Sequence, residues 1–380
     1  MVKICVDCRY IRERPSGIST LVQALVDYLP AMAPDYRFLF LKHPKAPGRL
    51  SIEPNVEERI VKQEANGLAT LMYLPRVVDL SDVDLFHATY NILPAGLKMP
   101  TVVTLCDVMW LKHPYWARQP GLWGFVETAF YQHGIRSALA NATRIMAISE
   151  ETKREIGTLD RAAEGRTRVA LEGIAPEFRA LESDAGRALI ESARVRWLKS
   201  ASRYILTIGQ FSGYKNHERV VRAFAQAFPE QRDVHLALIQ RLGPGAKTLR
   251  PIARELGISE RVHFLSGVPF DDLIALINGA TALCHPSLYE GFGNPPAEAM
   301  ACGCPVVTSN CSSMPEVSGD AALLVNPESV DDIARALRTV AQDSELADSM
   351  RQRGLRRAKE LSWKIFAAKN LEVYREVLGQ

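Results

Sequence analysis

Short, almost wholly apolar runs alternate along this chain with longer segments of helical periodicity, and this alternation constrains the fold most. The runs lack a regular exchange of polar and apolar residues, which is typical of parallel strands covered on both faces. Between them, apolar residues recur at helical spacing, as in residues 18–29 and 220–228. The pattern predicts an α/β architecture built on doubly wound parallel sheets. The expected strands are residues 2–6, 38–41, 85–88, 102–105, 144–148, 204–208, 234–239, 262–265, 282–285, 306–308 and 323–325.

These expected strands fall into two groups, separated by a charged, strand-poor segment at about residues 177–203. A chain of 380 residues has the length of two ordinary domains. We therefore expect one doubly wound domain over residues 1–180 and a second over residues 181–362. Parallel sheets place ligand sites at the carboxyl ends of their strands, so two such domains facing each other would form a cleft.

Composition excludes several classes of protein. The chain has 46 Lys+Arg against 43 Asp+Glu, a net charge of +3 that does not suggest a dedicated nucleic-acid binder. It contains no apolar stretch long enough to span a bilayer and does not begin like a signal peptide, so we expect a cytoplasmic protein. The seven cysteines are expected to be free thiols, because the Cys5–Cys8 pair lacks the second pair that structural zinc requires.

The segment richest in potential chemistry reads HPSLYEGFGNPPAEAMACGCPVVTSN, from His285 onward. A strand ends there, a glycine-rich turn follows, and a helix begins that we expect Asn294 to cap. Free N–H groups and the positive end of that helix favour an anion. Glu290 and Glu298 flank this turn, and carboxylates beside an anion suit sugars or ribose. A surface charge and a helix-dipole partner explain the two glutamates equally well.

This string resembles the donor-site signature of glycosyltransferase family 4, and the resemblance extends over almost the whole chain. It implies a GT-B fold, with two Rossmann-like domains facing a cleft that holds a nucleotide-sugar. It also implies that a last helix, residues 363–380, crosses back to the first domain. In that family pattern Glu298 binds the nucleotide ribose and Glu290 lies beside the donor sugar. The backbone that contacts this sugar then belongs to Gly291, Phe292, Gly293 and Asn294, the last of which stands where the family usually has leucine or isoleucine.

A second strand–glycine–helix segment, IGQFSGYKNHERVVRAF, places Gly209 after a strand and Lys215 just before a helix. A lysine there can neutralise a diphosphate leaving group, although a solvated surface lysine is the alternative. The segment is similar to the family's Arg-Lys-Asn motif, in which Lys215 and Asn216 match. Tyr214 replaces the arginine, and Gln210 stands where some members have another. The resemblance makes Gly209, Lys215 and Asn216 donor-binding residues and Lys215 also catalytic, together with Glu290.

Several positions in the first half match the family less fully. Gly17 resembles a glycine loop that packs against donor phosphates, and a plain helix-start turn explains it as well. The strand TVVTL leads to Cys106 and Asp107, where the family often has His-Asp. The resemblance makes Asp107 catalytic, although an aspartate there often caps a turn. Cys106, His87 and Ser149 match acceptor-side positions, and the alternatives are a satisfied buried histidine for His87 and a helix N-cap for Ser149.

Two further features bear on metals and membranes. Asp82 and Asp84 spell the Asp-x-Asp of metal-dependent glycosyltransferases, but we assign them to a surface turn and expect no metal and no other cofactor. Residues 109–131 interleave aromatic and basic side chains, which suits a membrane interface or a lipid-linked acceptor, with packing in a core as the alternative. We expect a peripheral position on the cytoplasmic face of the inner membrane.

Within the family, the resemblance is closest to bacterial mannosyl- and rhamnosyl-type enzymes of surface polysaccharide (lipopolysaccharide) synthesis. It implies a retaining, metal-independent hexosyltransferase that moves mannose or a related sugar from a GDP-sugar to a growing, lipid-linked polysaccharide. A transferase using UDP-glucose or UDP-N-acetylglucosamine, or a sugar-phosphate synthase, is an alternative. An inactive sugar-binding scaffold is an alternative of another class, motivated by Tyr214, Gln210 and Cys106.

Overall fold

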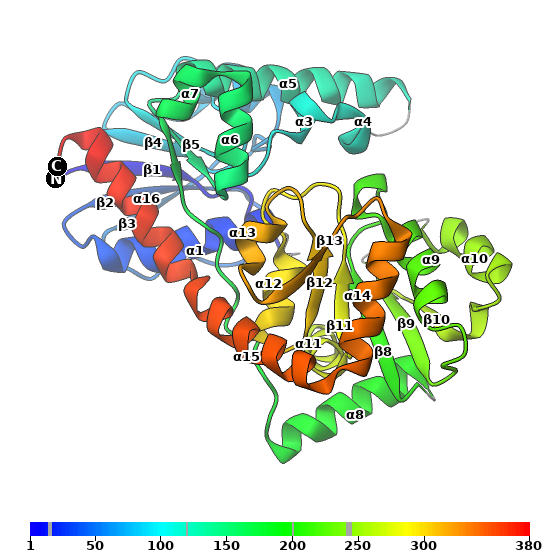
Figure 1. The fold of residues 1–380 in the computed structure, drawn as a ribbon. Helices are drawn as coiled ribbons and strands as arrows, with labels where there is room; N and C mark the ends of the chain where they lie inside the picture. Colours follow the sequence, from blue (N-terminus) through cyan, green and yellow to red (C-terminus); the bar gives the residue numbers. More distant parts are fainter. Residues whose placement is uncertain (14–16, 119–120, 200, 241–244) are drawn as a thin grey trace. The chain divides into compact units, whose positions relative to one another are not determined.

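The computed structural model describes residues 1–13, 17–118, 121–199, 201–240 and 245–380, which form two compact units (Figure 1). The first unit contains Met1–Gly173 and Ser362–Gln380, and the second contains Ile174–Leu361. The sequence places the join between domains near residue 180, and the observed join follows Gly173. The second unit is therefore a continuous segment inserted between two parts of the first.

The first unit is built on a parallel sheet whose seven described strands run in the order β3-β2-β1-β4-β5-β6-β7. The chain winds outward from β1 in one direction and then from β4 in the other, which is the doubly wound pattern expected from the sequence. Its strands are β1 (Lys3–Asp7), β2 (Arg37–Lys42), β3 (Val56–Ile60), β4 (Leu85–Ala88), β5 (Thr101–Leu105), β6 (Arg144–Ala147) and β7 (Thr167–Val169).

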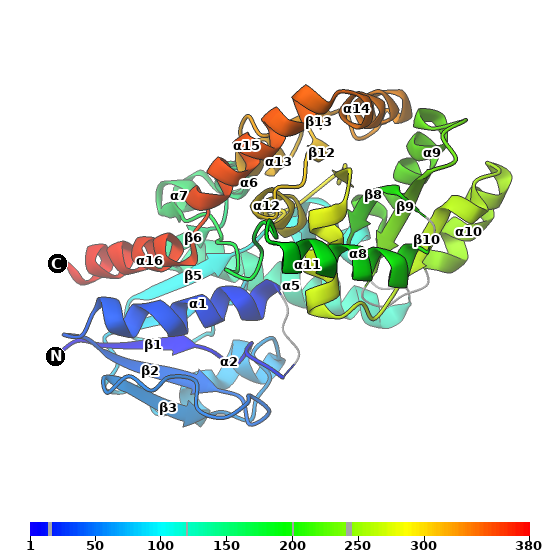
Figure 2. The same ribbon diagram turned by 90° about the horizontal axis from the view of Figure 1, so that it is seen from below.

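Helices cover both faces of this first sheet. α1 and α16 lie side by side on one face (Figure 2), and α2 and α5 pack on the other through a shared apolar core. The predicted return of the last helix is visible here, since α16 completes the core of the first unit. The helices are α1 (Gly17–Met32), α2 (Leu68–Val77), α3 (Met109–Lys112), α4 (Pro114–Ala117), α5 (Leu122–Asn141), α6 (Glu150–Leu159), α7 (Arg161–Gly165) and α16 (Trp363–Leu378).

The second unit repeats the design with a parallel sheet in the order β10-β9-β8-β11-β12-β13. Its strand order reverses between β8 and β11, so the loops after these two neighbouring strands diverge and leave room for a ligand. The strands are β8 (Arg203–Ile208), β9 (Val234–Ile239), β10 (Val262–Leu265), β11 (Ala282–His285), β12 (Val306–Ser309) and β13 (Ala322–Val325).

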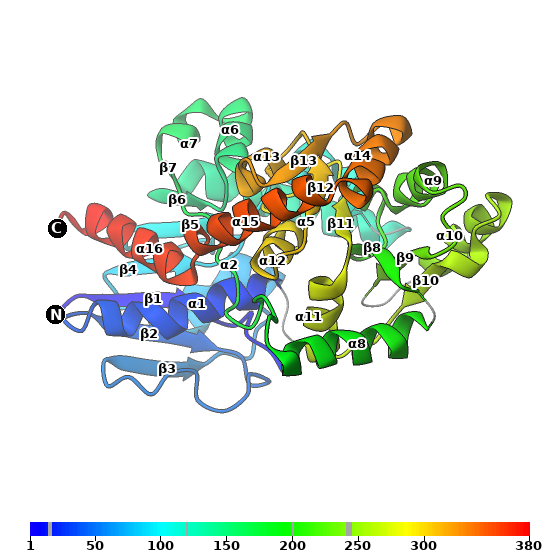
Figure 3. The ribbon, with the colours of Figure 1, turned by 60° about the horizontal axis from the view of Figure 1, so that its bottom comes forward.

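Both faces of the second sheet are covered as well. α9, α10 and α14 share one apolar core with it, while α8 packs on α11 and α12 packs on α15 over the other face (Figure 3). The α-helices are α8 (Asp184–Leu198), α9 (His217–Ala227), α10 (Gly245–Glu255), α11 (Phe270–Gly279), α12 (Asn294–Ala301), α13 (Met314–Ser318), α14 (Val330–Gln342) and α15 (Ser344–Glu360). Two 3-10 turns are η1 (Gly213–Lys215) and η2 (Ser259–Arg261).

The structure adds three elements that the sequence pattern does not predict. β3 and β7 are edge strands, and β3 reads VEERI with its polar side chains partly exposed. An edge strand lacks the continuous apolar run by which a central parallel strand is recognised. The charged segment predicted to lack strands forms α8, whose N-cap is Ser183.

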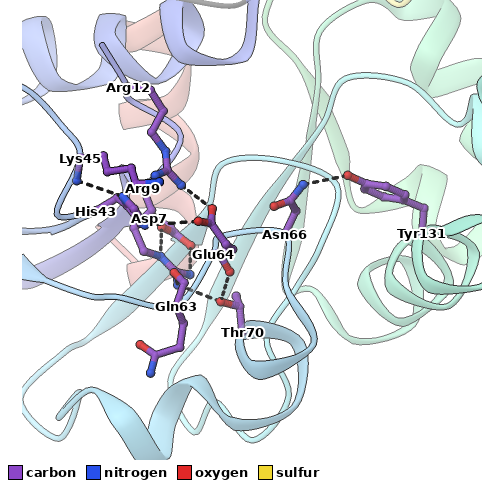
Figure 4. Close-up of polar contacts among 10 residues, drawn as sticks. All are labelled: Asp7, Arg9, Arg12, His43, Lys45, Gln63, Glu64, Asn66, Thr70 and Tyr131. Atoms are coloured by element: carbon purple, nitrogen blue, oxygen red, sulfur yellow. Dashed lines mark hydrogen bonds and ion pairs between the residues drawn. The ribbon is translucent and has the colours of Figure 1, made fainter. Parts of the chain in front are cut away.

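A buried ion pair fixes the end of β1 in the first unit (Figure 4). Arg9 is fully buried and donates to both carboxylate oxygens of Asp7, at 2.7 and 2.6 Å. Its remaining terminal nitrogen donates to the Thr70 hydroxyl at 2.8 Å and to the Gln63 carbonyl at 2.9 Å. The guanidinium therefore ties the loop after β1 to the start of α2.

We predict that Arg9→Met destabilises the first unit by about 3–5 kcal/mol, because it leaves the Asp7 carboxylate buried without its partner. Urea unfolding measures this loss. The matched control is Arg12→Met, since Arg12 pairs with the largely exposed Glu64 (Figure 4) and such a pair contributes about 0–1 kcal/mol. Equal losses in the two variants would contradict a special role for the buried pair.

Candidate functional site

The loops that follow β8 and β11 carry the donor-site motifs and are tied together by Asn216. This residue has a left-handed backbone with φ of 62° and lies between η1 and α9. Its amide nitrogen donates to the carbonyls of Pro286, at 2.9 Å, and Pro327, at 2.7 Å. Its amide oxygen accepts from Arg219 at 2.9 Å. Asn216 is predicted to bind the donor, and in the structure its side chain forms hydrogen bonds that join three loops.

A charged cluster lies where β8 and β11 end. It consists of Lys215, Glu290 and His285. Lys215 Nζ lies 2.5 Å from Glu290 Oε1, and His285 Nε2 lies 2.9 Å from the same oxygen. The exposed fractions of these side chains are 13%, 11% and 2%. Both sequence-predicted catalytic residues of the second unit are therefore in direct contact.

The charges of this pair are set by opposing effects. Burial alone would raise the pKa of Glu290, but Lys215 and His285 outweigh it and lower that pKa to about 2. Burial alone would lower the pKa of Lys215, and the Glu290 carboxylate outweighs it, so this pKa is raised. At neutral pH the site accordingly holds an ammonium beside a carboxylate. Within the described part of the chain, Glu290 Oε2 has no hydrogen-bond partner, which leaves that oxygen for a ligand.

Two serines from the loop after β12 hold the backbone of the glycine turn. Ser312 Oγ accepts from the Glu290 N–H at 3.0 Å and donates to the Glu290 carbonyl at 2.7 Å. Ser313 Oγ lies 3.0 Å from the same carbonyl and 2.8 Å from that of Phe292, a buried residue. The segment from Glu290 to Phe292 is therefore pre-formed rather than loose, as a site that must orient a sugar requires.

The helix after this turn, α12, begins at Asn294, with Gly293 at the N-cap and no side-chain cap. The expectation that Asn294 caps it is wrong, because its own backbone is already helical. Gly293 has φ of 104°, and a Cβ there would overlap the side chain of Met314. The left-handed backbone favours glycine at this position, whereas the Met314 overlap involves only the flexible end of that side chain. Gly291, Gly293 and the half-buried Asn294 follow Glu290 in this turn, and the contact of their backbone with a donor sugar stays a prediction.

Glu298 lies on α12, half-buried, and no hydrogen bond or ion pair to its carboxylate is found among the described residues. Burial raises its pKa to about 7. An acid kept partly neutral without a partner is costly for stability. It is also the arrangement expected for an oxygen that accepts from the hydroxyls of a bound ligand.

Tyr214 and Gln210 stand where the resembling family has arginines, so Lys215 has different neighbours here. Its ammonium lies 5.1 Å from the centre of the Tyr214 ring, an attractive cation–π distance. Gln210 is exposed, and its carbonyl accepts from His217 Nε2 at 3.3 Å. Gly209 follows β8, and a Cβ there would touch the Lys215 side chain at 3.6 Å. In this loop Lys215 therefore supplies the charge, and its neighbours shape its position.

In the first unit, the strand-end candidates have structural partners. Gly17 is the first residue of α1, and residues 14–16 of its loop lie outside the described residues. Asp107 Oδ1 accepts from the Met109 N–H at 2.9 Å. Asp107 therefore caps a turn, which is the alternative to a catalytic role considered above. Cys106 is buried, its N–H donates to Asn91, and burial raises the pKa of its thiol. A neutral, buried thiol is not a nucleophile.

His87 and Ser149 also have structural partners. His87 is fully buried on β4, with Nδ1 2.6 Å from Tyr374 Oη and Nε2 2.8 Å from Thr104 Oγ1. Burial lowers its pKa to about 3, so the ring is neutral. Ser149 caps α6 by accepting from the Thr152 N–H at 3.0 Å. The structure thus shows His87 as a buried histidine with both ring nitrogens paired and Ser149 as a helix N-cap.

The Asp-x-Asp sequence lies at the amino end of β4, opposite the edge where parallel sheets bind ligands. Asp82 pairs with Lys3 Nζ at 2.6 Å, and Asp84 accepts from the Lys3 N–H at 2.8 Å. Over the described ranges, no group of three or more His, Cys, Asp or Glu is arranged to hold a metal ion. All seven cysteines are free.

Sequence reasoning assigned no role to His285, Ser312 and Ser313, although all three contact Glu290. A histidine that ends a parallel strand just before a glutamate turn is a usable signal for His285. The two serines lie some twenty residues further along the chain, and nothing in their local sequence points to the glycine turn.

Comparisons with known proteins relate part of this chain to glycosyltransferases. Residues 190–357 match the family model for glycosyl transferases group 1. The chain is 40% identical over 154 residues to an MMP alpha-(1->4)-mannosyltransferase of Mycolicibacterium hassiacum, covering 40% of this chain and 37% of that protein. It is 41% identical over 114 residues to O-antigen chain mannosyltransferase B of Escherichia coli, covering 30% of each. The chain thus spans about a third of the length of these curated relatives.

The fold has known counterparts over its full length. A sucrose-phosphate synthase of Thermosynechococcus elongatus superposes with a TM-score of 0.72 at 19% identity, covering 100% of both chains. At that identity the likeness concerns the fold alone. Together with the two parallel sheets, it identifies the architecture as GT-B.

We predict that the change Glu298→Gln affects the free energy of unfolding differently at two pH values. Relative to wild type, the variant should be more stable at pH 8 than at pH 5 by about 2–3 kcal/mol. The folded protein holds this proton up to about pH 7, whereas the unfolded chain releases it near pH 4.5. Stability therefore falls as pH rises between these values, and glutamine removes the fall. Urea unfolding at both pH values measures it, with the exposed Glu328→Gln as control. Identical pH slopes in wild type and Glu298→Gln would refute the assignment.

Proposed function

Because residues 190–357 match the family model for glycosyl transferases group 1, we propose that the chain belongs to this family and transfers a hexose from a nucleotide-sugar to a glycan acceptor. The observation that carries the proposal is the arrangement at the carboxyl ends of β8 and β11. There Lys215 pairs with Glu290, whose second oxygen has no partner in the described chain, and Glu298 has an unpaired carboxylate.

Each part of the donor has a matching group in the second unit. The Lys215 ammonium has three N–H donors, of which one serves Glu290, and the others suit the diphosphate. The amino end of α12 adds the positive end of the helix dipole and the backbone N–H of Asn294 to the same anion, since Pro295 and Pro296 carry no N–H. Glu298 accepts from the ribose hydroxyls, and Glu290 Oε2 accepts from a hydroxyl of the sugar.

The reaction needs stabilisation of the leaving group more than it needs a base. As the glycosidic bond breaks, negative charge grows on the diphosphate, and a pre-placed ammonium lowers the energy of that state. We propose retention of configuration, with the departing phosphate taking the acceptor proton on the same face. Among the described candidates, Asp107 and Cys106 are engaged in structural contacts, and no step is assigned to them.

The favoured donor is a GDP-sugar carrying mannose or a related hexose. Support comes from the relatives, two of which are named mannosyltransferases, one of them for O-antigen chains. Transfer from UDP-glucose or UDP-N-acetylglucosamine, or synthesis of a sugar phosphate, is the alternative. An inactive scaffold would bind a nucleotide-sugar without consuming it, so turnover decides between these classes.

We predict that the purified protein consumes one nucleotide-sugar in the presence of EDTA and that Lys215→Ala lowers kcat by about 100-fold to 1,000-fold. The assay measures release of nucleoside diphosphate from GDP- and UDP-sugars with a glycan acceptor. The matched control is Lys247→Ala, an exposed lysine on α10 of the same unit. Full activity of Lys215→Ala, or activity that requires added Mg²⁺, would refute this part of the proposal.

We further propose that the acceptor is lipid-linked and that the first unit contacts the cytoplasmic face of the inner membrane. α2 and α5 border a pocket of about 450 Å³. Leu68, Trp123 and Val126 line this pocket and are 67%, 82% and 51% exposed. The same two helices also expose Met72 (49%), Tyr73 (48%), Leu122 (79%) and Phe125 (58%). Arginines lie over two of these rings, Arg118 over Phe125 at 4.1 Å and Arg76 over Tyr73 at 5.4 Å.

Such a surface fits a lipid bilayer with anionic headgroups. Exposed patches of this kind are rare on monomeric proteins, and aromatic rings flanked by cations suit the interface between headgroups and acyl chains. Trp123 is not a core residue, whereas Trp110, Phe130 and Tyr131 of the same stretch pack in apolar clusters, so the proposed membrane contact rests on the exposed side chains alone. No helix in the described ranges is long and apolar enough to cross a membrane, so the proposed contact is with the surface.

We predict that the protein floats with phosphatidylglycerol vesicles and that the double change Trp123→Ala, Phe125→Ala reduces the bound fraction at least about tenfold, because it removes two inserted rings. Flotation measures it, and neutral phosphatidylcholine vesicles should bind less. The matched control is Leu189→Ala, Val195→Ala, two exposed apolar residues of α8. Equal flotation of both double variants would contradict the membrane surface assigned to α2 and α5.

A further inference from the structure

His285 is a buried histidine whose ring belongs to the charged cluster of the second unit, and the proposed function gives it no role. It ends β11 with 2% of its side chain exposed. Its Nε2 lies 2.9 Å from Glu290 Oε1 and 3.1 Å from Ser287 Oγ. Its own carbonyl accepts from Thr308 Oγ1 at 2.8 Å, which fixes the end of the strand.

The chemistry of these partners determines where the ring carries hydrogen. A carboxylate oxygen can accept a hydrogen bond but cannot donate one. A lone pair on Nε2 would therefore face the negative charge of Glu290 at 2.9 Å, which is repulsive. Nε2 must carry the hydrogen and donate it to Glu290, with the Ser287 oxygen beside it as a second acceptor.

Glu290 Oε1 thus has two donors, Lys215 and His285, and this pairing has a consequence when a diphosphate binds. The phosphate oxygens attract the Lys215 ammonium, which weakens its bond to Glu290. A buried carboxylate that loses its partner is destabilised, because its desolvation is then no longer offset by an ion pair. The bond from His285 remains, because His285 belongs to β11 and not to the loop that carries Lys215.

We propose that His285 is a positioning residue for Glu290: it holds Oε1 in place when Lys215 turns to the donor diphosphate, so that Oε2 stays directed at the donor sugar. The inference rests on the proposed function, since it assumes a diphosphate at Lys215. His285 itself touches no substrate atom.

The groups that face the ring set how it titrates. Glu290 and the carbonyl of Ile208 favour a charged ring, whereas burial, the largest effect, and Lys215 favour a neutral one. His217 on α9 faces the same space, and burial together with His285 lowers its pKa to about 4. Loss of the Glu290 charge should therefore lower the pKa of His285, and a diphosphate that screens Lys215 should raise it.

The first test needs no turnover. Histidine-ring NMR of the full chain follows the titration of His285, with His285→Gln identifying its signal. We expect an Nε2–H ring that titrates at lower pH in Glu290→Gln than in wild type, and at higher pH when GDP or UDP is bound. An unchanged titration in Glu290→Gln would overturn the proposal whether or not the protein is an enzyme.

The second test separates positioning from folding and from nucleotide binding. His285→Leu removes the donor, and we expect kcat to fall about 10-fold to 100-fold with the dissociation constant for nucleoside diphosphate changed less than about threefold. His285→Gln places an amide N–H near the Nε2 position, and we expect it to restore kcat to within about fivefold of wild type. His263→Gln on β10, a histidine that stacks on His235 away from this loop, is the matched control and keeps wild-type kcat.

The outcomes distinguish the two proposals. If wild type turns over and His285→Leu keeps the wild-type kcat, or if glutamine fails to restore kcat, the positioning role is wrong and the glycosyltransferase proposal stands. If wild type consumes no nucleotide-sugar, the proposed function is wrong, and the NMR titration still decides whether His285 and Glu290 are coupled.

Discussion

The edge of the second sheet where β8 and β11 end depends on one side chain, the amide of Asn216, which bonds to other parts of the protein. Its two hydrogen bonds to the carbonyls of Pro286 and Pro327 join the loops after β8, β11 and β13 at one edge of the sheet. Lys215 precedes it directly, so the position of the ammonium follows from this junction. An aspartate would replace both donors with acceptors, and the buried carbonyls would then lose their partners. The ion pair, the glycine turn and α12 all rest on this arrangement.

The central strands and the main charged residues could be predicted from the sequence, because each belongs to a pattern formed by residues that are adjacent in the chain. β9 and β11 are continuous apolar runs, and Lys215 and Glu290 belong to recognisable loop motifs. The edge strands β3 and β7 were missed, since partial exposure allows polar residues that hide the pattern. The contacts of Ser312 and Ser313 with the turn at Glu290 depend on tertiary folding and have no local signature. Asn216 was predicted to bind the donor, which stays a prediction, and its side-chain hydrogen bonds to the neighbouring loops could be found only in the structure.

Two glutamates of this site show how environment separates identical side chains. Glu290 is buried against a cation and an imidazole and has its pKa lowered to about 2. Glu298 is buried without a partner and has its pKa raised to about 7. The first contributes to stability and function together, whereas the second reduces stability while the site is empty. Such an opposition between stability and function is typical of binding sites.

The division of the first unit into two segments affects how the protein is made. Its sheet is synthesised early, but α16, which covers α1 and places Tyr374 against His87, follows the whole of the second unit. At ~5–20 residues per second, the ribosome needs about 10–40 s to make the intervening segment. During that time the second unit can complete its own core, because every one of its elements is contiguous in the chain. Until α16 is made, α1 alone covers the sheet face that the two helices share, and the apolar surface left exposed there is what a chaperone would meet on the nascent chain.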